Sequence, residues 1–200
     1  MKTRNYILAF ALGALSLGAC QSHKDSKGAA DSANQAKDTM RTGVSDSGKA
    51  ASPPIKVEES DAKFAVEAAN GGMAEVVFGK LAVEKSNNAK VKDFGNMMVT
   101  DHSKVNDELK ALAKKLNITL PDSIASDESK TRDELAKKSG ADFDKAYVQD
   151  MVDDHKKDVK AFEDAAKNCK DSDLKAFAVK TLPTLKMHLE AIEKVKRHMK

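Results

Sequence analysis

The sequence lacks tryptophan and has only four prolines and 4% aromatic residues among its 200 residues. Two of the prolines are adjacent, at Pro53 and Pro54, so long proline-free segments remain in which helices can continue without a break. We therefore do not expect a β-rich fold, and the length fits one modest domain better than two. Glycine-rich phosphate loops, paired zinc-ligand motifs and nucleophile motifs are also missing, so the sequence does not indicate a reaction.

Neither sign of charge dominates the sequence. Lysine and arginine together number 34, and aspartate and glutamate together number 31, which gives a formal net charge of +3. Lys2 and Arg4 belong to a segment that we expect to be removed, and without them 32 basic residues remain against 31 acidic ones. A nucleic-acid partner is not expected, because such proteins carry a basic excess and aromatic side chains that stack on bases.

The first residues have the pattern of a bacterial export signal. Two basic residues precede an apolar run from Tyr6 to Leu17 that is too short to span a bilayer stably. The run ends in Leu-Gly-Ala-Cys at residues 17–20, which resembles a lipobox, the motif whose cysteine is acylated and becomes the first residue. We predict a lipoprotein signal peptide over residues 1–19 and a lipid on Cys20. The alternative is ordinary signal cleavage beside an incidental cysteine.

The residue after Cys20 bears on the destination of the protein. Gln21 stands there instead of aspartate, and in the familiar sorting rule this favours the outer membrane, on its periplasmic side. The next residues, 22–60, are rich in serine, lysine, aspartate, alanine and glycine. We therefore predict that residues 20–60 form the lipidated cysteine and a flexible tether, and that residues 61–200 form the folded domain.

Apolar residues recur every three or four positions along four long stretches, which is the spacing of amphipathic helices. In one of them Val148, Val152, His155, Val159 and Phe162 fall on a single stripe. We predict long helices over residues 61–86, 88–116, 142–168 and 172–198, and a short extra helix over 127–138 in the second connection. This order predicts an all-α fold, an up-and-down four-helix bundle.

Each predicted long helix carries one polar side chain within its apolar stripe. These residues are Glu75, His102, His155 and His188. At a rise of about 1.5 Å per residue their heights agree within about one or two turns, so we expect one polar layer in the middle of the core. Such a layer can bind a metal ion, or it can be a hydrogen-bonded network that only fixes the register of the helices.

A short repeat adds to this layer. The pattern Met-Val-x-Asp-His-x-Lys occurs at residues 98–104 and again at 151–157, so a methionine precedes a histidine by one turn in both places. The aspartate beside each histidine could orient the imidazole or bind an ion itself, whereas the methionines could instead fill the core. The predicted metal ligands are Glu75, Met98, Asp101, His102, Met151, Asp154, His155 and His188, and no catalytic residue is predicted.

At these residues the chain resembles a bacterial family of secreted, predicted outer-membrane proteins whose shared domain has no assigned function and is regarded as ferritin-like. The resemblance covers residues 61–198 and rests on the segments Phe64–Glu75, Gly79–Ala82, Met98–Leu109, Phe143–His155 and Leu182–His188. It implies a ferritin-like helical bundle and an envelope location. A di-iron site of the ferritin type uses Glu-x-x-His pairs, and this sequence has none.

The predicted ligands suit copper, because thioether and imidazole groups bind Cu(I) and Cu(II), and iron is the second metal considered. We expect a lipid-anchored periplasmic bundle, non-enzymatic or of unproven activity, that binds a transition metal ion in the polar layer. Two alternatives stay open. One is a structural or stress-related envelope protein in which the layer only specifies the fold, and the other is a metal-dependent redox enzyme. The sequence identifies the membrane as a partner, through Cys20, and no protein partner.

Overall fold

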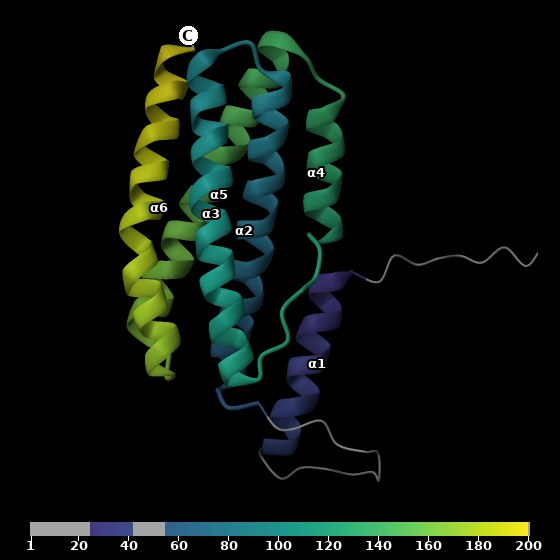
Figure 1. Cartoon of the computed structure of the whole chain (residues 1–200), viewed down its shortest axis with the longest axis vertical. Helices are drawn as coiled ribbons and strands as arrows, with labels where there is room; N and C mark the ends of the chain where they lie inside the picture. The colour runs from purple at the N-terminus through teal and green to yellow at the C-terminus, as the bar shows by residue number, and fades with distance from the viewer. Residues whose placement is uncertain (1–24, 42–54, 200) are drawn as a thin grey trace, which may run out of the picture.

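The structure, a computed structural model, describes residues 25–41 and 55–199 (Figure 1). The predicted signal peptide over residues 1–19 and the predicted lipid on Cys20 lie outside these residues. Every regular element in the described ranges is an α-helix, so the prediction of an all-α helical bundle is confirmed. None of the described helices combines the length and the apolar character that crossing a membrane requires.

Four long helices form the bundle, and their bounds agree with the predicted ones within two residues. They are α2 (Glu59–Lys85), α3 (Ala89–Leu116), α5 (Gly140–Asn168) and α6 (Ser172–His198), and the short helix α4 (Ser126–Ala136) lies in the second connection. Helix α2 packs against α3 and α5, and α6 packs against the same two helices (Figure 1). The four long helices therefore surround a common core.

Polar side chains define where several of these helices begin and end. Asn88 accepts a hydrogen bond from the amide of Lys90 at the start of α3. Asp171 accepts one from the amide of Asp173 at the start of α6. Asn117 ends α3 in the left-handed conformation, with φ at 58°. The two side chains accept hydrogen bonds from amides that would otherwise be free at the helix starts, and the left-handed Asn117 turns the chain away at the end of α3. These three residues therefore fix where α3 and α6 begin and where α3 ends.

Two glycines allow α2 and α3 to approach closely. A Cβ atom at Gly79 would lie 2.6 Å from the carbonyl oxygen of Gly95, and a Cβ atom at Gly95 would lie 2.7 Å from that of Gly79. Any other residue at either position would push the helices apart. Glu75 lies one turn before Gly79 on α2, so this contact helps to set the height at which Glu75 meets α3.

The structure differs from the predicted tether, because Ser26–Arg41 form helix α1, which packs against α2 (Figure 1). Asn34 fastens α1 to a distant loop. Its Nδ2 donates to the carbonyl of Thr119 at 2.8 Å, and its Oδ1 accepts from the amide of Thr119 at 2.7 Å. The prediction of a flexible tether over residues 20–60 is therefore wrong for residues 26–41, since polar contacts rather than an apolar stripe hold this helix.

The core also begins before the predicted residue 61. Ile55 and Val57 are 2% and 4% exposed and belong to the hydrophobic core together with Leu116. The amide of Lys56 donates to the carbonyl of Leu116 at 3.2 Å, which fastens this segment to the end of α3. Two apolar residues outside a helix give no periodic signal, so the sequence did not indicate that they are buried.

The apolar core is divided into two clusters. The Phe162 cluster includes Ala65, Leu109, Phe162, Phe177 and Leu185, and the Phe94 cluster includes Phe78, Phe94, Met98, Tyr147, Met151 and Ile192. Between them the chain carries His102 on α3, His155 on α5 and His188 on α6, all buried. The polar layer predicted from the sequence therefore separates the two apolar clusters.

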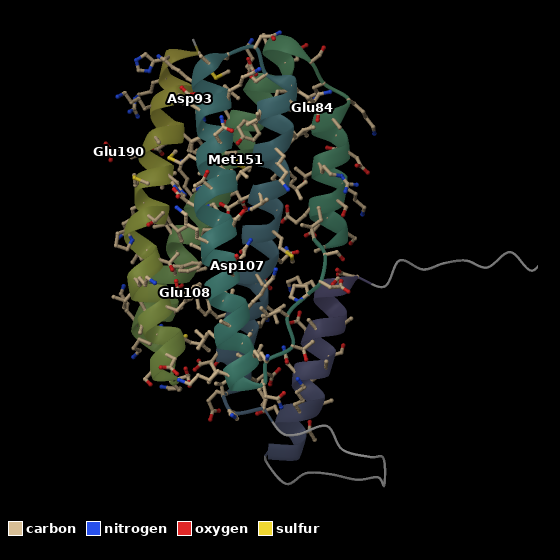
Figure 2. The ribbon with its side chains drawn as sticks, viewed as in Figure 1. Glu84, Asp93, Asp107, Glu108, Met151 and Glu190 are labelled. Atoms are coloured by element: carbon tan, nitrogen blue, oxygen red, sulfur yellow. The ribbon has the colours of Figure 1, made fainter. Side chains whose placement is uncertain are left out.

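Charged residues cover the outside of the bundle. In Figure 2 the labelled Glu84 and Asp93 are exposed, whereas Met151 is buried in the core. Lys180 on α6 pairs with Glu108 on α3 at 2.7 Å. Exposed pairs of this kind contribute about 0–1 kcal/mol each, so the stability of the bundle comes mainly from its core.

Candidate metal centre

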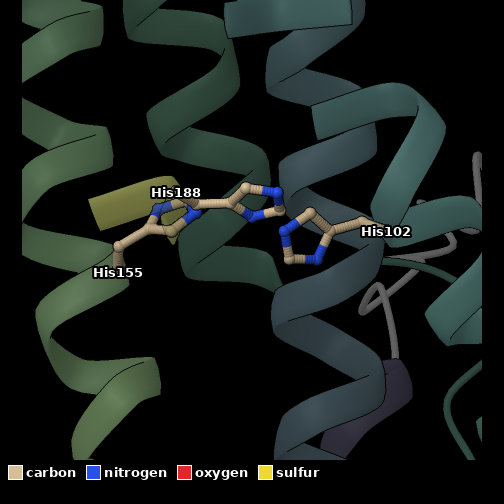
Figure 3. A group of neighbouring side chains, drawn as sticks. All are labelled: His102, His155 and His188. Carbon is tan, nitrogen blue, oxygen red and sulfur yellow. The ribbon is translucent and has the colours of Figure 1, made fainter. Parts of the chain in front are cut away.

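Three histidines from three helices converge in the polar layer. His102, His155 and His188 are 3%, 0% and 0% exposed, and one ring nitrogen of each lies within 4.8 Å of one ring nitrogen of the others. Figure 3 shows the three rings pointing toward one another. The ring centroids are 5.2 to 5.9 Å apart. The layer therefore gathers three imidazoles within the reach of one ion.

Each imidazole has one nitrogen held by a neighbouring group. Nδ1 of His155 donates to the carbonyl of Met151 at 2.9 Å, and Nε2 of His188 donates to Oδ2 of Asp101 at 3.1 Å. Nδ1 of His102 lies 2.6 Å from Oε2 of Glu75. Histidines that bind metals are commonly oriented in this way, through the ring nitrogen that does not face the ion.

The other nitrogen of each ring has no hydrogen-bond partner. These atoms are Nε2 of His102, Nε2 of His155 and Nδ1 of His188, and all three are buried without a partner among the residues that the structure describes. A buried polar atom without a hydrogen bond lowers the free energy of unfolding by about 1–3 kcal/mol. Three such atoms in one layer are therefore the feature of the fold that most needs an explanation.

The contact of His155 with Met151 fixes the form of its ring. A carbonyl oxygen only accepts, so the proton of the neutral ring is on Nδ1 and Nε2 has a free lone pair. Burial, together with the neighbouring His102 and His188, lowers the pKa of His155 to about 3. Nε2 lies 3.2 Å from Oε1 of Glu75, so two acceptors face each other unless a proton or a cation lies between them.

A group of carboxylates adjoins the histidines. Glu75 on α2 is 1% exposed, and one oxygen each of Glu75, Asp154 and Asp158 lie within 4.8 Å of one another. Burial, and then repulsion from Asp154, raises the pKa of Glu75 well above its usual range. Burial, and then repulsion from Asp158, raises the pKa of Asp154 to about 7. The metal-free protein therefore has difficulty in ionising all three groups.

A half-open cavity of about 300 Å³ leads to these carboxylates from the side of the bundle between α2, α4 and α5. Its lining includes Asn70, Gly71, Glu128, Asp154, Lys157 and Asp158. Glu128 comes from α4, and burial followed by repulsion from Asp154 raises its pKa to about 7. Carboxylates thus lead from the surface to Glu75, which in turn contacts His102 and His155.

The structure places the eight predicted site residues in four settings. Glu75, His102, His155 and His188 lie together in the polar layer. Asp101 contacts His188 of α6 rather than its own neighbour His102, and Asp154 lies in the carboxylate group. Met98 and Met151 are fully buried members of the Phe94 cluster.

Sequence reasoning missed two acidic residues near the site. Asp158 follows Asp154 by one turn on α5, and this i,i+4 spacing of two carboxylates was a signal that could have identified it. Glu128 lies on the short helix α4, where it belongs to no apolar stripe. Only the packing of α4 against α2 and α5 brings it to the cavity.

Comparisons with known proteins give a family and a fold. A family model described as "Domain of unknown function (DUF4142)" matches residues 46–195. A solved structure of a DUF305 fragment from Deinococcus radiodurans is similar, with a TM-score of 0.61 and 10% sequence identity over 70% of this chain and 96% of that chain. A putative secreted DUF305 protein from Streptomyces coelicolor has a TM-score of 0.59 and 13% identity over 70% of this chain and 93% of that chain. None of the curated proteins compared matches the sequence.

Proposed function

The chain belongs to the DUF4142 family, and from its buried histidines we propose that it binds one transition metal ion through His102, His155 and His188. The observation that supports this proposal is the set of three buried ring nitrogens without hydrogen-bond partners among the described residues. One cation that accepts a lone pair from each ring would give all three nitrogens a partner and so remove the free-energy cost of burying them unpaired. A network that served only the fold would be expected to satisfy them with each other or with nearby donors.

Copper is the metal that we propose first. Three imidazoles suit copper, zinc and iron, and among divalent ions of the first transition row Cu²⁺ binds nitrogen ligands most tightly. Oε1 of Glu75, 3.2 Å from Nε2 of His155, is an additional donor for the same ion. Asp101 acts as a positioning residue for His188. Met98 and Met151, which fill the Phe94 cluster, are not needed as ligands in this proposal.

We also propose that the chain is exported and held at a membrane, the outer membrane by the sorting rule, through a lipid on Cys20. The support is the order of a basic start, a short apolar run and a cysteine after small residues. The similar protein from Streptomyces coelicolor is described as a putative secreted protein. Labelling of cells with a fatty-acid analogue should mark the chain and should not mark Cys20→Ser; equal labelling of both would contradict the anchor.

Metal retention tests the proposed site. The chain from Lys24 to Lys200 keeps every residue that the structure describes and leaves out His23. Purified without a histidine tag, it is loaded with Cu(II), Zn(II) or Fe(II) and desalted. We expect about one Cu(II) per chain and a higher melting temperature, because an ion that binds only the folded state stabilises it.

Two variants complete the experiment. His155→Gln should lose the bound copper and the rise in melting temperature, whereas His198→Gln, which removes an exposed histidine, should keep both. Equal retention by the wild type and His155→Gln would contradict the proposal. If no ion is retained by any chain, the polar layer only specifies the fold.

A further inference from the structure

The carboxylates beside the histidines form a group of their own. Glu75, Asp154 and Asp158 each place one oxygen within 4.8 Å of the other two. Glu75 comes from α2, and the two aspartates come from successive turns of α5. Three acidic oxygens from two helices are thus held at the spacing of ligands around one ion.

The basic side chains that contact these carboxylates are His102 and His155, and both lie against Glu75. Within residues 25–41 and 55–199, no lysine or arginine forms an ion pair with any of the three. Glu75 is 1% exposed, and neither of its oxygens has an aligned hydrogen-bond donor in those ranges. Oδ2 of Asp154 is also buried and has no hydrogen-bond partner in those ranges. Glu75 is buried, and the two aspartates are half-buried. Carboxylates this far enclosed without a lysine or arginine partner either keep their protons or bind a cation.

We propose that Glu75, Asp154 and Asp158 form a second cation site, which takes a hard divalent ion such as Mn²⁺. Three carboxylate oxygens are the ligands that Mn²⁺, Mg²⁺ and Ca²⁺ prefer, whereas the imidazole group suits softer ions. The two sites share Glu75, which contacts His102 and His155 and also belongs to the carboxylate group. The second site therefore adjoins the first and differs from it in the metal that it selects.

The cavity between α2, α4 and α5 gives an ion access to this site. Asp154 and Asp158 line it, and Glu128 adds a further acidic group. Gly71 also lines it, and a Cβ atom there would lie 3.7 Å from Oδ1 of Asp158. A residue without a side chain thus stands beside the carboxylates, in a cavity whose lining also includes Lys157 and Phe162.

Titration with Mn(II) tests the second site without relying on copper binding. The disappearance of the paramagnetic resonance signal of free Mn(II) measures binding to the chain from Lys24 to Lys200. A variant with His155→Gln and His188→Gln keeps all three carboxylates, and we expect its dissociation constant to stay within about threefold of the wild-type value. Asp158→Asn should weaken binding at least about tenfold, which is the loss typical when a group that supports a metal site is removed.

Asp153→Asn is the matched control, since Asp153 is exposed and lies one residue from Asp154, and it should bind Mn(II) like the wild type. Asparagine has nearly the same size and shape as aspartate, so Asp158→Asn should fold, and its melting curve checks this. Equal binding by Asp158→Asn and the wild type, or no Mn(II) uptake by any chain, would overturn the proposal. Loss of Mn(II) in the histidine variant as complete as in Asp158→Asn would also overturn it, because one site centred on the histidines would then explain both. Copper retention that fails while Mn(II) binds as expected would contradict only the proposed function.

Discussion

One backbone carbonyl determines how His155 faces the centre of the bundle. The carbonyl oxygen of Met151 accepts a hydrogen bond from Nδ1–H and so leaves Nε2 with a free lone pair. Asp101 does the same for His188 through the opposite ring nitrogen, Nε2, and so leaves Nδ1 free. The free nitrogen is therefore Nε2 on His102 and His155 but Nδ1 on His188, and its identity follows from the neighbour of each ring rather than from the residue type.

Asp154 should make the metal-free protein sensitive to pH. Its pKa is about 7 in the folded chain, against an ordinary value of 3.8. A raised carboxyl pKa gives stability that is complete below the ordinary pKa and is lost as the pH rises through the folded pKa. In a chelating buffer, Asp154→Asn should therefore unfold with a free energy roughly 2–4 kcal/mol higher than the wild type at pH 8, and with little difference at pH 4.

Denaturant unfolding at the two pH values measures this difference, with Asp153→Asn as the control. The exposed Asp153 should give no gain at either pH. An Asp154→Asn variant that is less stable than the wild type at pH 8 would show that the charged carboxylate has a partner in the fold. The same variant should bind Mn(II) more weakly, so stability and binding should change in opposite directions.

At the scale of the helices, periodicity made most of the fold predictable. The four long helices and the layer of Glu75, His102, His155 and His188 follow from spacing along the chain, because each helix must turn one stripe to the core. Helix α1 and the role of Glu128 did not follow. Both depend on contacts between segments far apart in sequence, such as Asn34 with Thr119, and a local pattern does not encode such contacts.

The close approach of α2 and α3 should be sensitive to a single methyl group. Gly79→Ala would place a Cβ atom 2.6 Å from the carbonyl oxygen of Gly95, so we expect a loss of about 1–3 kcal/mol in the free energy of unfolding. Gly71→Ala is the control on the same helix, since its Cβ atom would lie at an ordinary 3.7 Å from Asp158. It should be neutral or gain up to about 1 kcal/mol. Similar effects of the two changes would refute the packing described for α2 and α3.

Helix α1 should detach without unfolding the bundle. Asn34→Ala removes both hydrogen bonds to Thr119, so amide hydrogen exchange over residues 26–41 should become faster. The melting temperature and the metal content should stay near the wild-type values, because none of the proposed ligands lies on α1. Gln35→Ala, at an exposed neighbouring position, should leave exchange unchanged. Unchanged exchange in Asn34→Ala as well would show that other contacts hold α1.

At the scale of the whole molecule, a polar layer divides an apolar bundle into two halves. Among the described residues, the layer that holds the histidines and Glu75 lies between the Phe162 cluster and the Phe94 cluster. A bound ion would link α3, α5 and α6 across that layer. The metal should therefore stabilise the bundle as a single cooperative unit, and one unfolding transition is expected for the loaded protein.

If all three histidines bind the same ion, pulsed paramagnetic resonance of the Cu(II)-loaded chain should detect all three. The nitrogen couplings should indicate three imidazole ligands in the wild type and in His198→Gln, and two in His188→Gln. A spectrum that His188→Gln leaves unchanged would contradict the account, because copper would then lie outside the layer formed by His102, His155 and His188.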